Sequence, residues 1–410
     1  MGEEKKIGEV AIVIMGQSPE GETYNREGDG LPLLNGPTEF GPFSPQCTLF
    51  TTDSKRECFP GDLLFCVRGS TTGRMNWADQ KYSLGRGVCA IRGDAPLATK
   101  YLRYCLGVYL PALLNLAGGG TFPNLRKNDI EGFAIPFHKH YEKIASILSA
   151  YDDLIENNLR RIKILEEMAQ AIYREWFVKF SFPGHEKTRM VDSPMGKIPE
   201  GWEVKPLREL TDVITKGTTP TTLGKPFTEE GVNFVKVESV DNHGAIREEK
   251  LAKIDTETHA LLRRSQLVKD DILYSIAGAI GRVTLVPERV LPANTNQALA
   301  IIRSSDPLFV PYLYLNIRSP EFVNFSLGRV VQTAQANVSL SVLSAAPVAF
   351  PPGGLLQLLT NTVGPMLGQI DCLLTKDTNL RQTRDLLLPK LISGELDISD
   401  LDIKTGGHMQ

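Results

Sequence analysis

The sequence has few cysteines and no long apolar run. No two cysteines form a CxxC pair, and the spacing fits neither a disulfide framework nor a zinc site among Cys47, Cys58, Cys66, Cys89, Cys105 and Cys372. Scattered cysteines are typical of buried thiols in a reducing compartment. No stretch reaches the roughly 20 apolar residues that a membrane helix needs, and no apolar segment flanked by basic residues opens the chain. We therefore expect a cytoplasmic protein without a membrane segment.

Motifs for chemistry on nucleic acids are also missing. Phe350-Pro-Pro-Gly353 lacks the amide that heads an Asn/Asp-Pro-Pro-aromatic tetrad, and the turn Gly69–Arg74 is too short for a Walker A loop and has arginine in place of Lys-Ser/Thr. His138 and His140 are the only close histidine pair, with no Cys or carboxylate at ligand spacing. The sequence predicts no catalytic site, no metal site and no cofactor bound by this chain.

Charge and length leave a binding function open. The net charge is only -3, which does not indicate a nucleic-acid binder but does not exclude one, because a basic face can be offset by acidic surface elsewhere. The 410 residues exceed one ordinary core and favour two domains with connectors.

Two stretches have the 3.5-residue apolar period of a helix that packs against a partner helix. In the first stretch the repeating positions are Ile144, Leu148, Tyr151, Ile155, Ile162, Leu165, Ala169, Ile172 and Trp176, with Asn158 as the polar member. In the second they are Leu359, Val363, Met366, Ile370, Leu373, Leu380, Leu387 and Leu391. Each follows a globular stretch of similar length, so we expect the two helices to bury each other.

The second stretch is less regular than the first. Gly364-Pro365 lies inside it, and proline removes a helix hydrogen bond, so we expect a kink or a late helix start. Asp377 and Arg384 also fall on apolar positions of the repeat. A buried amide such as Asn158 fixes helix register at some cost in stability.

The globular halves repeat one order of elements, which predicts a duplicated α/β architecture. In each half an alternating strand, such as Leu63–Val67 or Ile272–Ile276, is followed by a glycine turn, another strand, a helix, a loop and a last strand. The predicted segments are a first domain (1–138), a long helix (139–180), a linker (181–200), a second domain (201–352), a second long helix (353–396) and a loose tail (397–410).

Several motifs together resemble the specificity subunit of type I restriction–modification systems. Met195–Val204 followed by Lys216-Gly-Thr-Thr-Pro220 is similar to the family's entry into a recognition domain, and Gly16-Gln-Ser-Pro19 is its counterpart in the first half. Asp152–Asn158 and Leu387–Leu396 resemble the beginning and the end of its helical regions. The order of these motifs, present twice, covers nearly the whole chain.

The resemblance implies a specific architecture and set of partners. It implies two target-recognition domains related by a pseudo-two-fold axis and separated by two antiparallel helices that form a coiled coil. It also implies binding to double-stranded DNA, docking of methyltransferase subunits that hold S-adenosylmethionine, and a restriction subunit that translocates DNA. The helices would set the spacing between two half-sites.

The candidate DNA contacts are polar residues of the loops. Arginine can bond guanine O6 and N7 together, and asparagine or glutamine can pair with adenine. The candidates are Gln17, Ser18, Arg68, Ser70, Thr71, Arg74, Arg86, Lys216, Thr218, Thr219, Arg282, Asn294, Asn296, Gln297, Gln332 and Gln335. For Arg74 and Arg282 an ordinary surface role in a tight turn is about as probable, and for asparagines turn capping competes.

Two other classes of function remain open. One is a coiled-coil scaffold that does not bind DNA directly, and the other is a fused DNA methyltransferase or nuclease.

Overall fold

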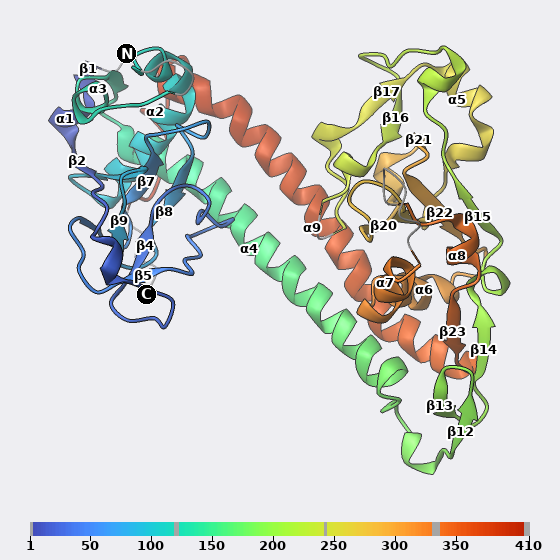
Figure 1. Cartoon of the computed structure of the whole chain (residues 1–410). Helices are drawn as coiled ribbons and strands as arrows, with labels where there is room; N and C mark the ends of the chain where they lie inside the picture. The colour runs from blue at the N-terminus through green and yellow to red at the C-terminus, as the bar shows by residue number, and fades with distance from the viewer. Residues whose placement is uncertain (1–2, 119–122, 242–243, 330–336, 406–410) are drawn as a thin grey trace. The chain divides into compact units, whose positions relative to one another are not determined.

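The computed structural model describes residues 3–118, 123–241, 244–329 and 337–405. The chain forms two compact units, Met1–Asn158 with Lys376–Gln410, and Leu159–Thr375. Two long helices, α4 (Tyr141–Tyr173) and α9 (Gly353–Ser393), contribute one part to each unit. Figure 1 labels the helices and strands of each unit and colours them along the chain from blue to red.

The described residues of the first unit form three sheets. Their strand orders are β2-β10-β7-β8, β3-β5-β4-β9-β6 and β1-β11. The elements are β1 (Glu3–Lys6), α1 (Ile7–Val10), β2 (Ala11–Met15), β3 (Tyr24–Asn25), β4 (Leu31–Leu34), β5 (Phe50–Thr51), β6 (Glu57–Cys58), β7 (Leu63–Cys66), β8 (Met75–Trp77), β9 (Tyr82–Leu84), β10 (Val88–Gly93), α2 (Pro96–Leu114), α3 (Lys127–Glu131) and β11 (Ala134–Phe137).

The second unit repeats this plan. Its sheets have the orders β15-β22-β19-β20, β17-β16-β21-β18 and β14-β23, and a hairpin β12-β13 is added. The strands are β12 (Met190–Ser193), β13 (Gly196–Pro199), β14 (Glu203–Pro206), β15 (Val213–Lys216), β16 (Val232–Val235), β17 (Ala252–Ile254), β18 (Gln266–Leu267), β19 (Ile272–Ser275), β20 (Val283–Leu285), β21 (Ala293–Thr295), β22 (Leu299–Arg303) and β23 (Pro347–Phe350), and the helices are α5 (Thr256–Leu261), α6 (Phe309–Ile317), α7 (Pro320–Leu327) and α8 (Leu340–Ser344).

The matching strand orders confirm the predicted duplication. β2, β10, β7 and β8 correspond to β15, β22, β19 and β20, and in each unit one pair of strands of the second sheet is parallel, β4 with β9 and β16 with β21. Tyr101 and Tyr312 occupy matching helices, and their hydroxyls donate to the carbonyl oxygens of Pro136 and Ala349 at 2.8 and 2.7 Å. The two units therefore share one architecture.

The central strands lie between two cores. In β19, Ile272 and Tyr274 face the cluster that contains α6, whereas Leu273 packs into the core under the second sheet. In β7, Phe65 and Leu64 divide in the same way. The alternation seen in the sequence therefore identified one face of each strand, but both faces are buried, as in a sheet covered on both sides.

In the first unit, α4 and α9 pack against each other. Leu148 is buried in one cluster with Leu391 and Ile392. Asn158 Nδ2 donates to Asp377 Oδ1 at 2.9 Å, and Arg384 Nη1 donates to Asp152 Oδ1 at 2.6 Å. Residues later in α4 contact residues earlier in α9, so the two helices are antiparallel.

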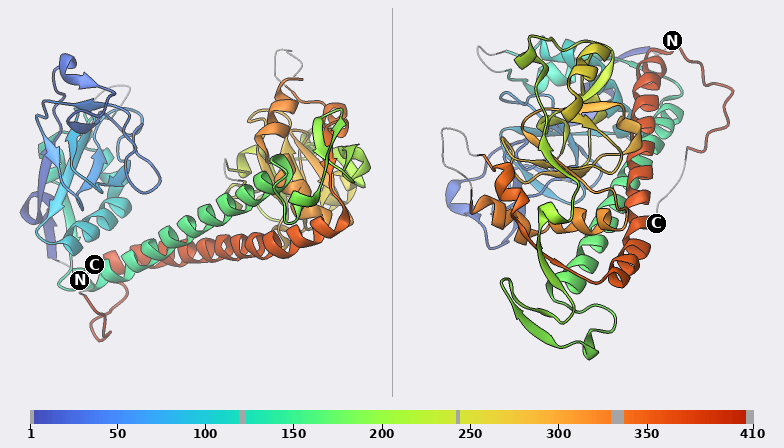
Figure 2. Two further views of the ribbon diagram at one scale, coloured as in Figure 1. Left: turned by 90° about the horizontal axis from the view of Figure 1, so that it is seen from below. Right: turned by 90° about the vertical axis from the view of Figure 1, so that its right-hand side faces the viewer.

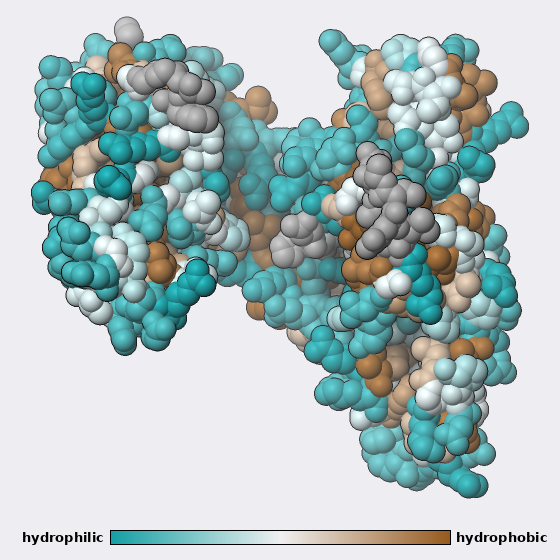
Figure 3. Space-filling view, viewed as in Figure 1, coloured by the Kyte–Doolittle hydropathy of each residue, from teal (hydrophilic) through white to brown (hydrophobic). Residues whose placement is uncertain are grey.

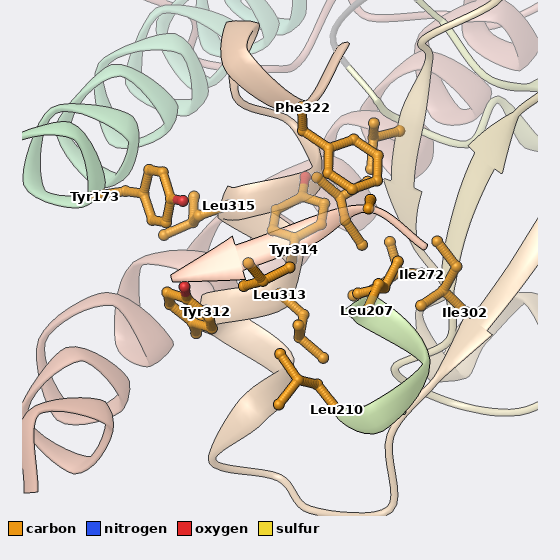
Figure 4. Packing of buried hydrophobic residues seen from close by; sticks show 14 of the residues in the cluster. Tyr173, Leu207, Leu210, Ile272, Ile302, Tyr312, Leu313, Tyr314, Leu315 and Phe322 are labelled. Carbon is orange, nitrogen blue, oxygen red and sulfur yellow. The ribbon is translucent and has the colours of Figure 1, made fainter. Parts of the chain in front are cut away.

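The same pairing occurs inside the second unit, where the two ribbons lie side by side (Figure 2). Ala169 and Tyr173 of α4 share a cluster with Leu359 and Val363 of α9. Figure 4 shows Tyr173 beside α6 residues Tyr312 and Leu315 within this core. Of the predicted helix contacts, Ile144, Leu148, Ile155, Asn158, Ile162 and Leu373 are buried and Tyr151, Leu165, Ile370, Leu380 and Leu387 are half-buried. The mutual burial of the two helices is confirmed within each unit.

Three local expectations differ from the structure. The helix α9 begins at Gly353 and continues through Gly364-Pro365, so the late start is wrong. The expected linker contains the β12–β13 hairpin, which protrudes in Figure 2. The start of the tail is not loose, because Ile398 is buried and Lys143 Nζ donates to the carbonyl oxygens of Ser399 and Leu401.

No helix among the described residues is both long and apolar enough to cross a membrane.

Candidate nucleic-acid interface

A glycine loop passes over the ends of the central strands in each unit. The Gly16 N–H donates to the Val88 carbonyl oxygen, and the Gln17 N–H to that of Leu84. In the second unit the Thr218 N–H donates to the Thr295 carbonyl oxygen. A Cβ on Gly16 would lie 2.1 Å from the Gly85 carbonyl oxygen. A Cβ on Gly217 would meet the Thr295 backbone in the same way, at 1.9 Å. Only glycine allows this close approach.

The hydroxyl that follows each glycine contacts the neighbouring strand connection. Arg86 donates through Nε to Ser18 Oγ at 3.2 Å. At the matching place Thr219 donates through its hydroxyl to Gln297 Oε1. The structure thus brings four of the predicted residues together in two equivalent pairs, one in each unit.

Arg68, Ser70, Thr71 and Arg74 lie on the turn between β7 and β8. Arg68 donates through Nε to Asn124 Oδ1 at 3.1 Å, and Arg74 donates through Nη1 to the Pro37 carbonyl oxygen at 3.2 Å. Both arginines and Ser70 are exposed, whereas Thr71 is half-buried beside Cys66. Hydrophilic side chains dominate the visible face of this unit (Figure 3).

Arg282 occupies the place of Arg74 in the second unit but is bound differently. Its Nη1 donates to the carbonyl oxygens of Val237 (3.2 Å) and Val240 (2.7 Å), and its buried Nε has no hydrogen-bond partner among the described residues. A guanidinium held this way fixes the 237–240 segment. The structure therefore favours a positioning role over the guanine contact expected from the sequence.

Asn294 does not fit the predicted base-reading role. Its side chain is fully buried, and Nδ2 donates to the Leu262 carbonyl oxygen and to Ser265 Oγ. Asn296 is half-buried and accepts from the Ala298 N–H, which is the turn-capping alternative. The sequence could not separate these amides, because burial depends on the packing of α5 against β21. Gln332 and Gln335 lie outside the described residues.

Lys216 ends β15 and is exposed, whereas Thr218 is half-buried. The edge of the central sheet at which these loops lie is formed by the ends of β2 and β7 and the start of β10 in the first unit, and by β15, β19 and β22 in the second. Two residues that the sequence did not indicate lie near this edge. Lys236 follows β16, with Nζ 4.1 Å from the centre of the Phe227 ring, and Asn35 follows the matching strand β4. The only feature that marks them as site residues is their position directly after a strand that pairs in parallel with its neighbour. This pairing can be recognised only once the order of strands in the sheet is known.

In each unit a partly buried ion pair lies at the opposite end of the central strands from these loops. Asp62 accepts from Arg92 Nε and Nη2 at 2.6 and 2.7 Å, and Asp271 accepts from Arg303 with the same two distances. These hydrogen bonds raise the pKa of both arginines. Each aspartate also accepts a backbone N–H three residues earlier, from Phe59 or Val268. Both pairs fix the start of a central strand, and neither pairing was predicted.

The side chains described at the edge where the loops lie are mostly hydrogen-bond donors, and the structure describes no cluster of acidic side chains there that could hold a metal ion. Among the described residues, no group of three or more His, Cys, Asp and Glu side chains is placed to hold a metal ion. Forked guanidinium groups, lysines, hydroxyls and amides are the side chains that contact phosphate oxygens and base edges. The arrangement is suited to binding nucleic acid.

Comparison with known proteins agrees with this arrangement. A family model described as the type I restriction modification DNA specificity domain matches residues 2–167 and again residues 199–354. The type I restriction enzyme MjaIX specificity subunit of Methanocaldococcus jannaschii is 26% identical over 423 residues, covering 97% of this chain and 94% of the relative. The HindI specificity subunit of Haemophilus influenzae is 23% identical over 338 residues, covering 68% and 72%.

A solved structure has the same fold. The S subunit of a type I restriction-modification system from M. genitalium aligns with a TM-score of 0.64 at 18% identity, covering 97% of both chains.

Proposed function

Because this chain belongs to the type I restriction–modification DNA specificity family, we propose that it is the sequence-specific DNA-binding subunit of such a complex. Each globular part reads one half of a bipartite target. The observation that supports this most directly is the duplicated edge, in which Gly16 and Gly217 pass over equivalent strand ends beside different polar side chains. One scaffold that presents different side chains is what two different half-sites require.

The chain has no catalytic role in this proposal. Methyltransferase subunits that hold S-adenosylmethionine dock on it, and a restriction subunit joins them. The two helices contribute the spacing between the half-sites, since a helix rises about 1.5 Å per residue. A matched heptad insertion in α4 and α9 keeps their apolar contacts in phase and changes the spacer of the methylated sequence.

Methylation mapping tests the proposal. The chain is co-expressed with its methyltransferase partner, and methylated sequences are mapped across the host genome. The proposal expects a single bipartite sequence with a fixed spacer. Methylation at scattered sites, or at one undivided sequence, would contradict it.

Two alternatives are separated by binding assays. A scaffold that does not bind DNA would leave the assembled complex without sequence preference in a gel-shift assay. A fused methyltransferase would bind S-adenosylmethionine as the isolated chain. We expect preference in the first assay and no binding in the second.

A further inference from the structure

Each unit has cationic side chains at the equivalent edge of its central sheet, but at different positions of that edge. In the first unit the Val67 N–H donates to the Gly87 carbonyl oxygen at 2.9 Å, and Arg68 and Arg86 each lie one residue beyond this bond. In the second unit the Ile276 N–H donates to the Ala298 carbonyl oxygen, also at 2.9 Å. The residues one position beyond that bond are Ala277 and Gln297. The two arginine positions are therefore uncharged in the second unit.

The lysines show the opposite distribution. Lys216 is the last residue of β15, where β2 of the first unit ends at Met15. Lys236 follows β16, where Asn35 follows β4, and both strands run parallel to the strand beside them. At these four compared positions each unit has two cations, which are arginines in the first unit and lysines in the second.

The two arginines are oriented for a forked contact. Arg86 Nε is bonded to Ser18 Oγ and Arg68 Nε to Asn124 Oδ1. Their terminal nitrogens have no hydrogen-bond partner in the part of the chain that the structure describes, and neither arginine is in an ion pair there. Like charges on neighbouring strands repel, so an acceptor bound between them would relieve a cost present in the free protein.

The lysines lack the rigid fork for such a contact. An ammonium is a point charge on a flexible stem, whereas guanidinium is a planar fork that matches paired acceptors. Lys236 Nζ lies over the Phe227 ring, and Lys216 is exposed. Lysines in these positions are suited to phosphate oxygens, which give affinity but no sequence information.

We propose that the first unit reads guanine at this edge through Arg68 and Arg86, whereas the second unit uses Lys216 and Lys236 to contact phosphates. This inference rests on the proposed DNA-binding function. It assigns a guanine-dependent position to the half-site of the first unit. At the equivalent place in the other half-site, the second unit contributes affinity without base selectivity.

Arg86→Lys and Arg68→Lys test the arginines, because lysine keeps the charge and loses the fork. The complex with methyltransferase subunits is titrated with its mapped target and with targets changed at single bases. Loss of a forked guanine contact corresponds to about 1–3 kcal/mol, or roughly 5- to 150-fold weaker binding. We expect this loss on the mapped target, together with loss of preference at one guanine of the first unit's half-site.

Arg26→Lys is the matched control. Arg26 is also exposed, but it follows β3, the outer strand that β5 separates from β4 and Asn35. We expect unchanged affinity and preference. If Arg86→Lys and Arg68→Lys also bind with unchanged preference, the arginines contact phosphates and the inference is wrong. The wild-type complex would still bind its bipartite target, so the proposed function would stand.

Lys216→Ala and Lys236→Ala test the second unit. We expect weaker binding by the same factor on every sequence, and a dependence of log affinity on log salt that is shallower by about one for each lysine. A change of preference at one base pair, with an unchanged salt dependence, would overturn this part of the inference. A wild-type complex with no preferred sequence would instead contradict the proposed function.

Discussion

Asn158 of α4 donates a hydrogen bond from Nδ2 to Oδ1 of Asp377 on α9, at 2.9 Å, and both side chains are buried. The other carboxylate oxygen of Asp377 is buried and has no hydrogen-bond partner in the described part of the chain. Burial therefore raises the pKa of Asp377, although the hydrogen bond from Asn158 acts in the opposite direction. This pair fixes the helix register at a cost in stability.

The unfavourable burial of the Asp377 carboxylate predicts that the free energy of unfolding depends on pH. A carboxyl whose pKa is higher in the folded chain binds its proton more tightly there, so its destabilising effect is complete above that pKa and fades as the pH falls through it. Asp377→Asn keeps an acceptor for Asn158 and removes the charge. We expect the variant to be more stable at pH 7, by up to about 1 kcal/mol, with a smaller difference at acidic pH.

Denaturant unfolding at several pH values measures this difference. Asp192→Asn is the control, because that side chain is 90% exposed and should show no comparable trend. A variant no more stable than wild type at pH 7, or an advantage that grows as the pH falls, would contradict the prediction.

Asp152 joins three elements of the first unit. Its carboxylate accepts from Arg384 Nη1, Tyr104 Oη and Arg103 Nη1 at 2.6, 2.6 and 3.2 Å. Asp152→Ala leaves two arginines and a buried tyrosine hydroxyl without this acceptor. We expect a loss of about 2–4 kcal/mol in the free energy of unfolding. Asp153→Ala, at an exposed neighbour, should cost less than about 0.5 kcal/mol, and equal losses would refute the assignment.

The packing of the two helices predicts that aspartate substitutions at buried and at exposed helix positions differ sharply in their effect on stability. Ile155 and Ile162 are 5% and 6% exposed, whereas Leu154 and Ile164 are each 54% exposed. Aspartate at Ile155 or Ile162 buries an unpaired charge, so we expect unfolding or aggregation. Aspartate at Leu154 or Ile164 should leave the melting temperature and circular dichroism nearly unchanged. Similar behaviour of both pairs of variants would show that these helices do not bury each other.

Helix period and element order could be predicted because they are local. The 3.5-residue repeat predicted the helix that contains Ile155, and the resemblance to the specificity-subunit family indicated that the loops at Gly16 and Gly217 are equivalent. The sequence also showed that Asp377 and Arg384 interrupt the apolar repeat. It could not show that their partners are Asn158 and Asp152, because helix register is a long-range property.

The candidate site was predicted less completely for the same reason. Arg86 and Ser18 are far apart in sequence and meet only because β2 pairs with β10. Asn294 and Gln297 belong to one loop-like stretch, yet one is fully buried and the other exposed. Burial of this kind is decided by which elements pack above the strand, and that information is not in the local pattern.

The close approach of the glycine loop to the neighbouring strand predicts that position 217 does not tolerate a side chain. Gly217→Ala places a methyl group against the Thr295 backbone, so the loop must move. We expect a loss of about 1–3 kcal/mol in stability and weaker DNA binding by the assembled complex. Gly21→Ala is the control, since nothing lies within 4 Å of its added Cβ. Normal stability and binding of Gly217→Ala would show that the close approach is not required.

The central claim is that the two globular parts read separate half-sites on one scaffold. Its most direct measurement is methylation mapping after residues 201–352 are replaced by the matching domain of a relative. The account predicts that one half-site changes to that of the relative, while the other half-site and the spacer remain. A target changed in both halves, or in neither, would contradict independent reading by two equivalent units.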